Sequence, residues 1–296
     1  MREHQRSSLT LLASLLTVAA FGLLALLAFT SDELSDPYSL LSWGYLGAIG
    51  PGYWGGLSGY KLCGTSKSQS PIDIVVDGAE FNNLLTPLKW DVHNTLSKCP
   101  GGKSIISNSG QGIQVDGLRA ELTFNETKFC LQQIQFHTHS EHSINDKFFP
   151  MEMQMLHTSL TGDKLVVSLM LQGGGKAGSD LMSTIGNNLP KKAGQSKPGP
   201  TQAQLFQFHQ SINSEHYFYY NGSLTAPPCT EDVLWIVLGV PFKTGAPIAK
   251  FKKLMKNNAR PIQPLQQREV QKSWADPEIG LPNYPPPLLY KKKAPK

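Results

Sequence analysis

Residues 129–157 have the sequence FCLQQIQFHTHSEHSINDKFFPMEMQMLH, which predicts two β-strands joined by a short connection. Six alternating residues should share one face of the first strand: Phe129, Leu131, Gln133, Gln135, His137 and His139. Glu152 and Gln154 should share one face of the second strand. Because side chains on neighbouring strands lie opposite one another, imidazoles on one strand and a ligand on the next can build a metal site. The pattern therefore indicates a candidate metal site in a sheet.

Four further motifs lie along the chain, two before this stretch and two after it. They are QSPIDI at 69–74, SNSGQG at 107–112, NGSLTAPPC at 221–229 and NARPIQPL at 258–265. Together with QFHTHSEH at 135–142 they resemble, in the same order, the alpha-class carbonic anhydrases over about residues 43–272. The resemblance implies a mainly β fold, in which a large, twisted, mostly antiparallel sheet of about ten strands carries short peripheral helices.

The register of this resemblance decides which residues fall on the zinc ligands. The family reads Q-F-H-x-H, then S-E-H, then E-x-H, and its flanking motifs fit Gln133 on one side and Ser140, Glu141 and His142 on the other without a gap. The three ligand positions then fall on Gln135, His137 and Gln154. One imidazole and two neutral amides are a poor ligand set for zinc. We therefore expect no cofactor, and zinc only at a rearranged site.

The resemblance also assigns the rest of the pocket. Glu141 and Thr225 fall on the gate pair that orients zinc-bound hydroxide, and we expect the pair to be retained without catalysing the reaction. Gln111 falls on a proton-shuttle position where active members often carry histidine, and an amide does not titrate near neutral pH. The other pocket positions fall on Tyr45, Asn108, Leu156, Leu224, Ala226, Val233 and Trp235.

An alternative site shifts the ligands by one pleat. His137 and His139 lie two residues apart, and an antiparallel partner would then present Glu152 in place of Gln154. Two histidines and one carboxylate form an acceptable zinc site. This set is the alternative to a protein without a metal.

The N-terminus predicts export. Residues 9–29, LTLLASLLTVAAFGLLALLAF, are almost continuously apolar, follow Arg2 and Arg6, and are long enough to span a bilayer. We favour a single-pass anchor at 1–30 over a cleaved signal peptide, which would leave the protein secreted. A linker at 31–42, the folded domain at 43–281 and a Pro- and Lys-rich tail at 282–296 should follow. The net charge of +5 comes largely from this tail, so nucleic-acid binding is not expected.

The cysteines are consistent with a lumenal or extracellular location in the secretory pathway. The resemblance implies a disulfide between Cys63 and Cys229, which requires an oxidising compartment. Cys99 and Cys130 could form a second bridge or remain buried thiols. Asn125 begins an Asn-Glu-Thr sequon and is the expected glycosylation site.

Three functions remain after these observations. The favoured one is a carbonic anhydrase-like protein that has lost zinc-dependent hydration of carbon dioxide and acts as a binding or scaffold component for an unidentified protein partner. The alternative is an active carbonic anhydrase, or carbonate dehydratase, using a rearranged zinc site. The third is a protein that binds a small ligand in the retained cavity without converting it.

Overall fold

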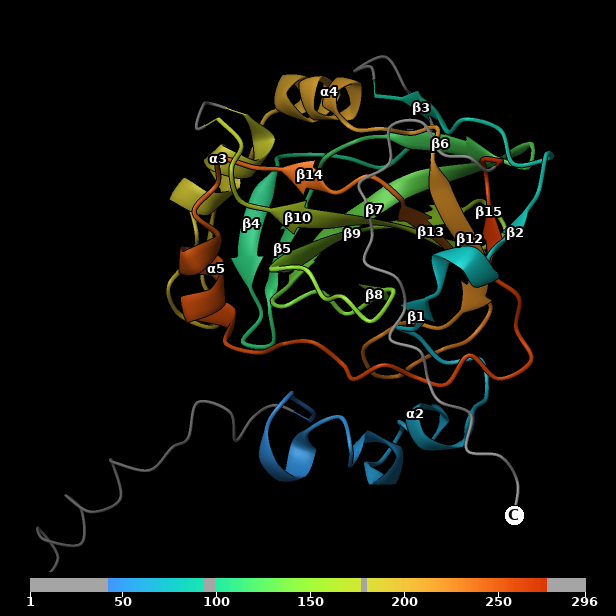
Figure 1. Cartoon of the computed structure of the whole chain (residues 1–296). Coiled ribbons are helices and arrows are strands. Elements are labelled where there is room, and N and C mark those ends of the chain that lie inside the picture. The colour runs from blue at the N-terminus through green and yellow to red at the C-terminus, as the bar shows by residue number, and fades with distance from the viewer. Residues whose placement is uncertain (1–41, 93–98, 177–179, 276–296) are drawn as a thin grey trace, which may run out of the picture. The chain divides into compact units, whose positions relative to one another are not determined.

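The computed structural model describes residues 42–92, 99–176 and 180–275. Within these ranges thirteen strands form one mixed sheet (Figure 1). Its main path runs β11-β4-β5-β7-β9-β10-β13-β12-β15-β2, with β14 beside β10 and with β6 between β7 and β3. Within this sheet the pairings among the described strands are antiparallel except those of β10 with β13 and β14 and of β15 with β2. The mainly β fold is confirmed, and short edge strands raise the count above the expected ten.

The long strands occupy the middle of this sheet. They are β7 (Thr127–His137), β9 (Met151–Ser159), β10 (Lys164–Gln172), β12 (Tyr217–Gly222) and β13 (Val233–Leu238). The shorter strands are β2 (Glu80–Phe81), β3 (Lys89–Asp91), β4 (Ile105–Asn108), β5 (Ile113–Asp116), β6 (Glu121–Phe124), β11 (Ser196–Pro198), β14 (Phe242–Lys243) and β15 (Gln271–Lys272). A separate two-stranded sheet pairs β1 (Asp73–Ile74) with β8 (Ser143–Ile144).

The described helices are short. They are α2 (Leu62–Thr65), α3 (Leu181–Asn187), α4 (Gln202–Ser211) and α5 (Ile248–Met255), with 3₁₀ turns η1 (Gly47–Ile49), η2 (Trp54–Gly56) and η3 (Val76–Gly78). Thr201 and Gln204 form a capping box that begins α4, and the Asp180 side chain accepts from Ser183 N to begin α3. None of the described helices is long and apolar enough to cross a membrane, and residues 9–29 lie outside the described ranges.

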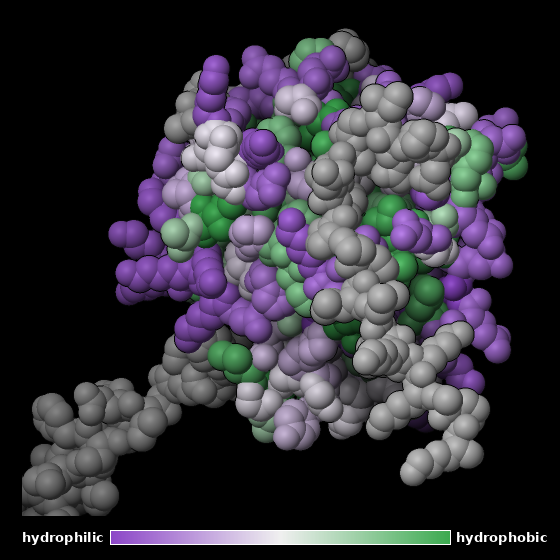
Figure 2. Space-filling model, in the orientation of Figure 1, coloured by the Kyte–Doolittle hydropathy of each residue, from purple (hydrophilic) through white to green (hydrophobic). Residues whose placement is uncertain are grey.

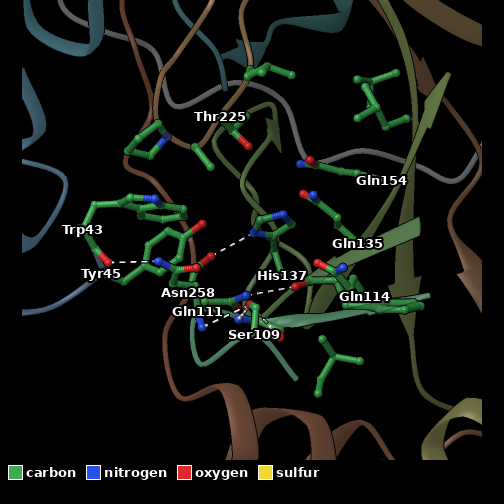
Figure 3. A pocket seen from close by; sticks show the side chains of 18 of the residues that line it. Trp43, Tyr45, Ser109, Gln111, Gln114, Gln135, His137, Gln154, Thr225 and Asn258 are labelled. Carbon is green, nitrogen blue, oxygen red and sulfur yellow. Dashed lines mark hydrogen bonds between the residues drawn. The ribbon is translucent and has the colours of Figure 1, made fainter. Parts of the chain in front are cut away.

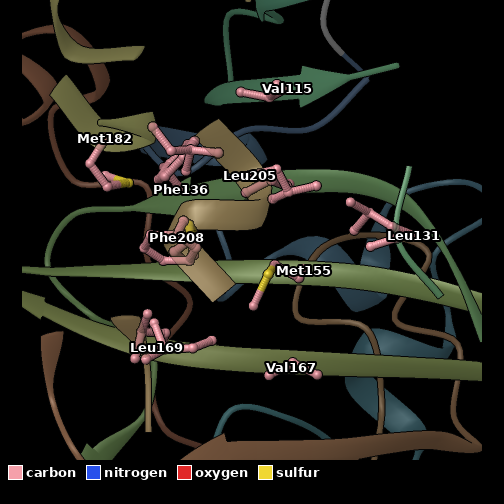
Figure 4. Packing of buried hydrophobic residues seen from close by; sticks show 14 of the residues in the cluster. Val115, Leu131, Phe136, Met155, Val167, Leu169, Met182, Leu205 and Phe208 are labelled. Atoms are coloured by element: carbon pink, nitrogen blue, oxygen red, sulfur yellow. The ribbon is translucent and has the colours of Figure 1, made fainter. Parts of the chain in front are cut away.

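The two faces of the sheet have different roles. On β9, Met151, Met153 and Met155 enter the main hydrophobic core, while Glu152 and Gln154 alternate with them on the opposite face. The main core continues through α3, α4 and α5, which contribute Met182, Leu205, Phe208 and Phe251 (Figure 4). Since the helices cover this face, the polar residues of β9 are directed to the other face.

A β-bulge corrects the predicted facing of β7. Leu131 pairs with His157 and Gln133 with Leu156, so one extra residue, the exposed Gln132, lies between them. Phe129 and Leu131 enter the same core as Ile134 and Phe136, whereas Gln133 and Gln135 lie on the opposite face. The prediction that the six alternating residues share one face is wrong, because the bulge changes the parity of the strand.

Both disulfides are formed. Cys63 is bonded to Cys229 across a separation of 166 residues, which confirms the expected bridge. Cys99 is bonded to Cys130, which settles the pair that the sequence left open. Together the bridges indicate an oxidising compartment.

The segment before the sheet packs as an aromatic cluster around the first bridge. The rings of Trp43, Tyr45 and Trp54 meet pairwise at 5.4–5.6 Å between centroids. Trp54 is fully buried beside Cys63 and Cys229. The disulfide and the aromatic rings therefore hold this N-terminal segment close to the loop that follows β12.

The surface around α5 is strongly hydrophilic (Figure 2). Phe251 and Met255 of this helix are buried, while Lys250, Lys252 and Lys253 are exposed. This is the usual pattern of an amphipathic helix whose charged face contacts water.

Candidate functional site

A pocket of about 230 Å³ opens on the sheet face opposite the helices. Its floor contains Gln135 and His137 from β7 and Gln154 from β9, whose side chains converge in Figure 3. Gln135 lies directly opposite Gln154 across the ladder, as predicted. The bulge at Gln132 is what directs the two β7 residues into the pocket.

His137 has one engaged and one open nitrogen. Its Nδ1 lies 2.8 Å from the carbonyl oxygen of Asn258 and must donate, because a carbonyl only accepts. The Asn258 side chain holds this loop in place by accepting from Thr138 N and donating to the Phe136 carbonyl oxygen. Nε2 of His137 is buried and has no hydrogen-bond partner within the part of the chain that the structure describes. In the neutral imidazole this atom presents a lone pair to the pocket.

Gln154 is held by two buried carboxylates. Its Nε2 donates to Glu141 Oε2 at 2.8 Å and to Glu152 Oε1 at 2.9 Å. Because carboxylates accept only, the amide nitrogen must face them, and Oε1 is left as the open end of the side chain.

Glu152 is an ionised group in a closed hydrogen-bond network. It accepts from the backbone N–H groups of Glu141 and His142, from His142 Nδ1 and from Ser168 Oγ. Burial raises the pKa of Glu152, but the charge and hydrogen bond of His142, with smaller effects from His137 and Ser168, outweigh it and lower the pKa to about 2. The carboxylate of Glu152, which lies behind the Gln154 amide, is therefore negatively charged.

The gate pair is not joined as expected. Glu141 accepts from Arg260 N through Oε1 and from Gln154 through Oε2. Thr225 lines the pocket, but among the described residues no hydrogen bond connects it to Glu141. The two carboxylate oxygens of Glu141 accept instead from the Arg260 backbone and the Gln154 amide.

Other predicted pocket residues divide into two groups. Tyr45, Gln111, Leu156, Leu224, Ala226 and Trp235 line the cavity. Asn108 does not line it: its side chain donates to the Pro190 carbonyl oxygen and accepts from Gly110 N, which shapes the β4–β5 turn. Val233 also lies outside the lining, because it is fully buried in a second hydrophobic cluster with Ile72 and Phe218.

The alternative metal set is not assembled. The exposed His139 lies beyond the end of β7, with Nδ1 2.6 Å from the Ser140 carbonyl oxygen and its ring 4.8 Å from that of Phe148. Glu152 is fully occupied within its network. Among the described residues no group of three or more His, Cys, Asp or Glu side chains is placed to hold a metal ion.

Gln114 and Val166 also line the pocket, although no sequence motif singled them out. Gln114 pairs with Gln135 across β5 and β7, and Val166 pairs with Leu156 across β9 and β10. Both could have been found from the alternation of β5 and β10 once the strand order was known, but the order itself comes from the tertiary structure.

The family model of the eukaryotic-type carbonic anhydrases matches residues 49–274. The chain belongs to this family. A carbonic anhydrase from Nostoc sp. is 34% identical over 240 residues, which are 78% of this chain and 85% of that protein. The solved alpha-carbonic anhydrase from Thermovibrio ammonificans, in complex with the inhibitor sulfanilamide, is 32% identical with a TM-score of 0.67, covering 77% of this chain and 98% of the other.

A second solved structure of this carbonic anhydrase fold is dioscorin complexed with ascorbate. It is 28% identical to this chain, with a TM-score of 0.66 and a coverage of 78% of this chain and 97% of dioscorin. Carbonic anhydrases normally use zinc, and the pocket floor of this family member contains Gln135, His137 and Gln154 at the positions that the motifs assign to the ligands.

Proposed function

We propose that this carbonic anhydrase family member does not retain zinc and acts as a binding protein. The observation that supports this most strongly is the pair of hydrogen bonds from Gln154 Nε2 to Glu141 and Glu152. The β9 position that the motifs assign to a zinc ligand is therefore occupied by a neutral amide whose nitrogen is committed to two carboxyl groups of the protein.

The donor set does not suit zinc. Protein zinc sites use thiolate, imidazole and carboxylate ligands, and at least three of these hold a catalytic ion. Here His137 Nε2 is the one imidazole nitrogen available at the floor among the described lining residues. The carboxamide oxygens of Gln135 and Gln154 are neutral and weak ligands for zinc, so the residues at this floor do not fit the ion.

The experiment is a zinc determination on the full-length protein after a mild chelator wash, together with a carbon dioxide hydration assay. We expect far less than one zinc per chain and no hydration above the background. As a matched control, the variant Gln135→His/Gln154→His restores the three-histidine pattern and should bind zinc. Native protein that keeps about one zinc per chain and hydrates carbon dioxide would overturn the proposal.

The alternative is an active carbonic anhydrase. Its support is the open Nε2 of His137 and the apolar wall of Leu156, Leu224 and Trp235, which a carbon dioxide molecule could occupy. The same assay decides between the two, because an enzyme with a rearranged site would show both bound zinc and turnover.

We propose that this chain binds its ligand or partner outside the cytoplasm. The two disulfides support an oxidising compartment, and residues 9–29 would anchor the chain in its membrane. Dioscorin has been solved with ascorbate, so at least one relative with this fold accommodates a small organic molecule. We propose that this chain likewise binds a ligand, either a small molecule or a protein partner, without converting it.

A further inference from the structure

Four glutamines line the pocket, and each has its amide nitrogen committed to the protein. Gln111 Nε2 donates to the Trp43 carbonyl oxygen at 3.0 Å, and Gln114 Nε2 donates to Asp116 Oδ2 at 3.1 Å. Gln135 Nε2 donates to Gln133 Oε1, and Gln154 Nε2 donates to Glu141 and Glu152. Gln154 uses both of its N–H groups in this way and each of the other three retains one, while the carbonyl oxygens of all four amides accept no hydrogen bond from the described residues and are left for a ligand.

Buried or half-buried carboxylates fix this orientation. Asp116 Oδ1 accepts from Gln133 Nε2 at 3.1 Å, so the nitrogen of Gln133 faces Asp116 and its oxygen faces Gln135. Gln135 must then present its nitrogen to Gln133 and keep its own oxygen free. Flipping any one of these amides would place two acceptors against each other, which costs about 1–3 kcal/mol for each buried pair.

His137 adds a fifth acceptor to the same floor. Its Nδ1 donates to the Asn258 carbonyl oxygen. The residue is only 3% exposed, and its buried Nε2 has no hydrogen-bond partner among the described residues. No lysine or arginine is among the described residues that line the pocket. The guanidinium of Arg260 is directed elsewhere, to Gln69 Oε1 and to the carbonyl oxygens of Ser70 and Cys63.

We propose that this pocket binds the protonated amine or guanidinium end of a small organic molecule. The N–H groups of such an end would donate to Gln135 Oε1, Gln154 Oε1 and His137 Nε2, and the carboxyl groups of Glu141 and Glu152 lie behind the Gln154 amide. An anion such as bicarbonate would meet oxygen atoms and a nitrogen lone pair instead. This inference rests on the proposed function, because a zinc ion would occupy the same acceptors.

The apolar side of the pocket determines the rest of the ligand. Leu156, Val166, Leu224 and Trp235 form one continuous wall, in which Leu156 and Val166 are paired across β9 and β10. A short hydrocarbon chain would be removed from water against these side chains. The ligand class is therefore a small amphipathic cation.

The experiment compares two probes with the same four-carbon chain, n-butylammonium and butyrate, on the full-length, chelator-washed protein. Binding is measured by calorimetry and by ligand-observed NMR at neutral pH. We expect n-butylammonium to saturate the protein and butyrate to bind at least about tenfold more weakly, a difference of ~1.4 kcal/mol. Equal or tighter binding of butyrate would overturn the proposal, and so would the failure of n-butylammonium to saturate at tens of millimolar.

Two matched variants place the binding in the pocket. Gln135→Glu adds a charge to the floor and should tighten n-butylammonium binding by about tenfold. Gln132→Glu adds the same charge to the exposed bulge residue three positions earlier and should leave the affinity unchanged. The same gain in both variants would show a general charge effect and contradict the proposal.

The failures of the two proposals can be told apart. Zinc is measured on the same preparation before chelation, so about one tightly held zinc per chain would contradict the proposed function itself. Zinc-free protein that prefers butyrate would leave the proposed function standing and contradict only the amine inference.

Discussion

At the residue scale, the buried polar groups decide what each face of the sheet can do. On the pocket face, each glutamine nitrogen donates to a carboxylate, carbonyl or amide oxygen of the protein, and acceptors are left over. On the core face, His209 is 5% exposed and both of its ring nitrogens lack partners among the described residues. Its ring lies 4.3 Å from that of Trp90, and Trp90 also contacts His157 at 5.6 Å.

These two histidines predict acid sensitivity. Burial lowers the pKa of His209 to about 3, assisted by the charge of His157, and burial lowers the pKa of His157 to about 4 despite its backbone hydrogen bonds. Both stay neutral in the folded protein, whereas in the unfolded chain they take up a proton below about pH 6.5. Their contribution to stability is therefore fully present above about pH 6.5 and is lost as the pH falls toward their folded values.

We expect His209→Phe to lose less stability on acidification than the native chain. The difference should be about 1.4 kcal/mol per pH unit between pH 6 and 4, because one of the two proton-linked groups is removed. Urea unfolding at a series of pH values measures it. His139→Phe, at an exposed position, is the control and should keep the native slope. A native slope in His209→Phe as well would contradict the assignment.

At the element scale, one inserted residue in β7 determines what the pocket contains. The bulge at Gln132 lets Phe129 and Leu131 enter the core before it and Ile134 and Phe136 after it. If Gln132 were instead pleated into a regular ladder, the alternation would place Gln133 and Gln135 in the core and Ile134 and Phe136 on the pocket face.

Deletion of Gln132 should therefore leave the facing of β7 intact, because it removes only the extra residue of the bulge. Leu131 and Gln133 already pair with consecutive residues of β9, so the shortened strand would form a regular ladder in the same register. We expect a folded protein that is destabilised by about 0.5–3 kcal/mol through local adjustment of the backbone. Soluble yield and near-ultraviolet circular dichroism are the measurements. Gln132→Ala keeps the residue count and should change the free energy of unfolding by less than about 0.5 kcal/mol. A deletion variant that fails to fold would contradict the assignment of Gln132 as the extra residue.

At the scale of the whole molecule, the two disulfides close loops of very different length. Cys63–Cys229 spans 166 residues and ties the aromatic N-terminal segment to the loop after β12. Cys99–Cys130 spans 31 residues beside β6 and β7. In the chain-entropy description, a longer closed loop removes more freedom from the unfolded chain.

We expect Cys63→Ala/Cys229→Ala to be the more destabilising pair. Loop length alone gives about 5 kcal/mol for this bridge and about 4 kcal/mol for Cys99→Ala/Cys130→Ala. Guanidinium unfolding of the two double variants without reductant measures both losses. A larger loss from the shorter loop would show that native packing around the sulfur atoms, rather than loop closure, sets the contribution of each bridge.

Much of this protein could be predicted from short motifs. The mainly β fold, the pairing of Gln135 with Gln154, the bridge between Cys63 and Cys229 and the lining by Tyr45, Leu156 and Trp235 all follow from residues in a fixed order. Local patterns suffice here because strand alternation and family motifs are contained in the sequence itself.

The sequence by itself determined the family, the fold class and the glutamines at the pocket floor. Only the tertiary structure decided which way these glutamines point, because an amide is turned by the acceptors around it, and Asp116, Glu141 and Glu152 come from three different parts of the chain. The bulge at Gln132 and the Cys99–Cys130 bridge were likewise decided by packing over long separations. The acceptor character of the pocket is therefore a property of the folded network and not of any one motif.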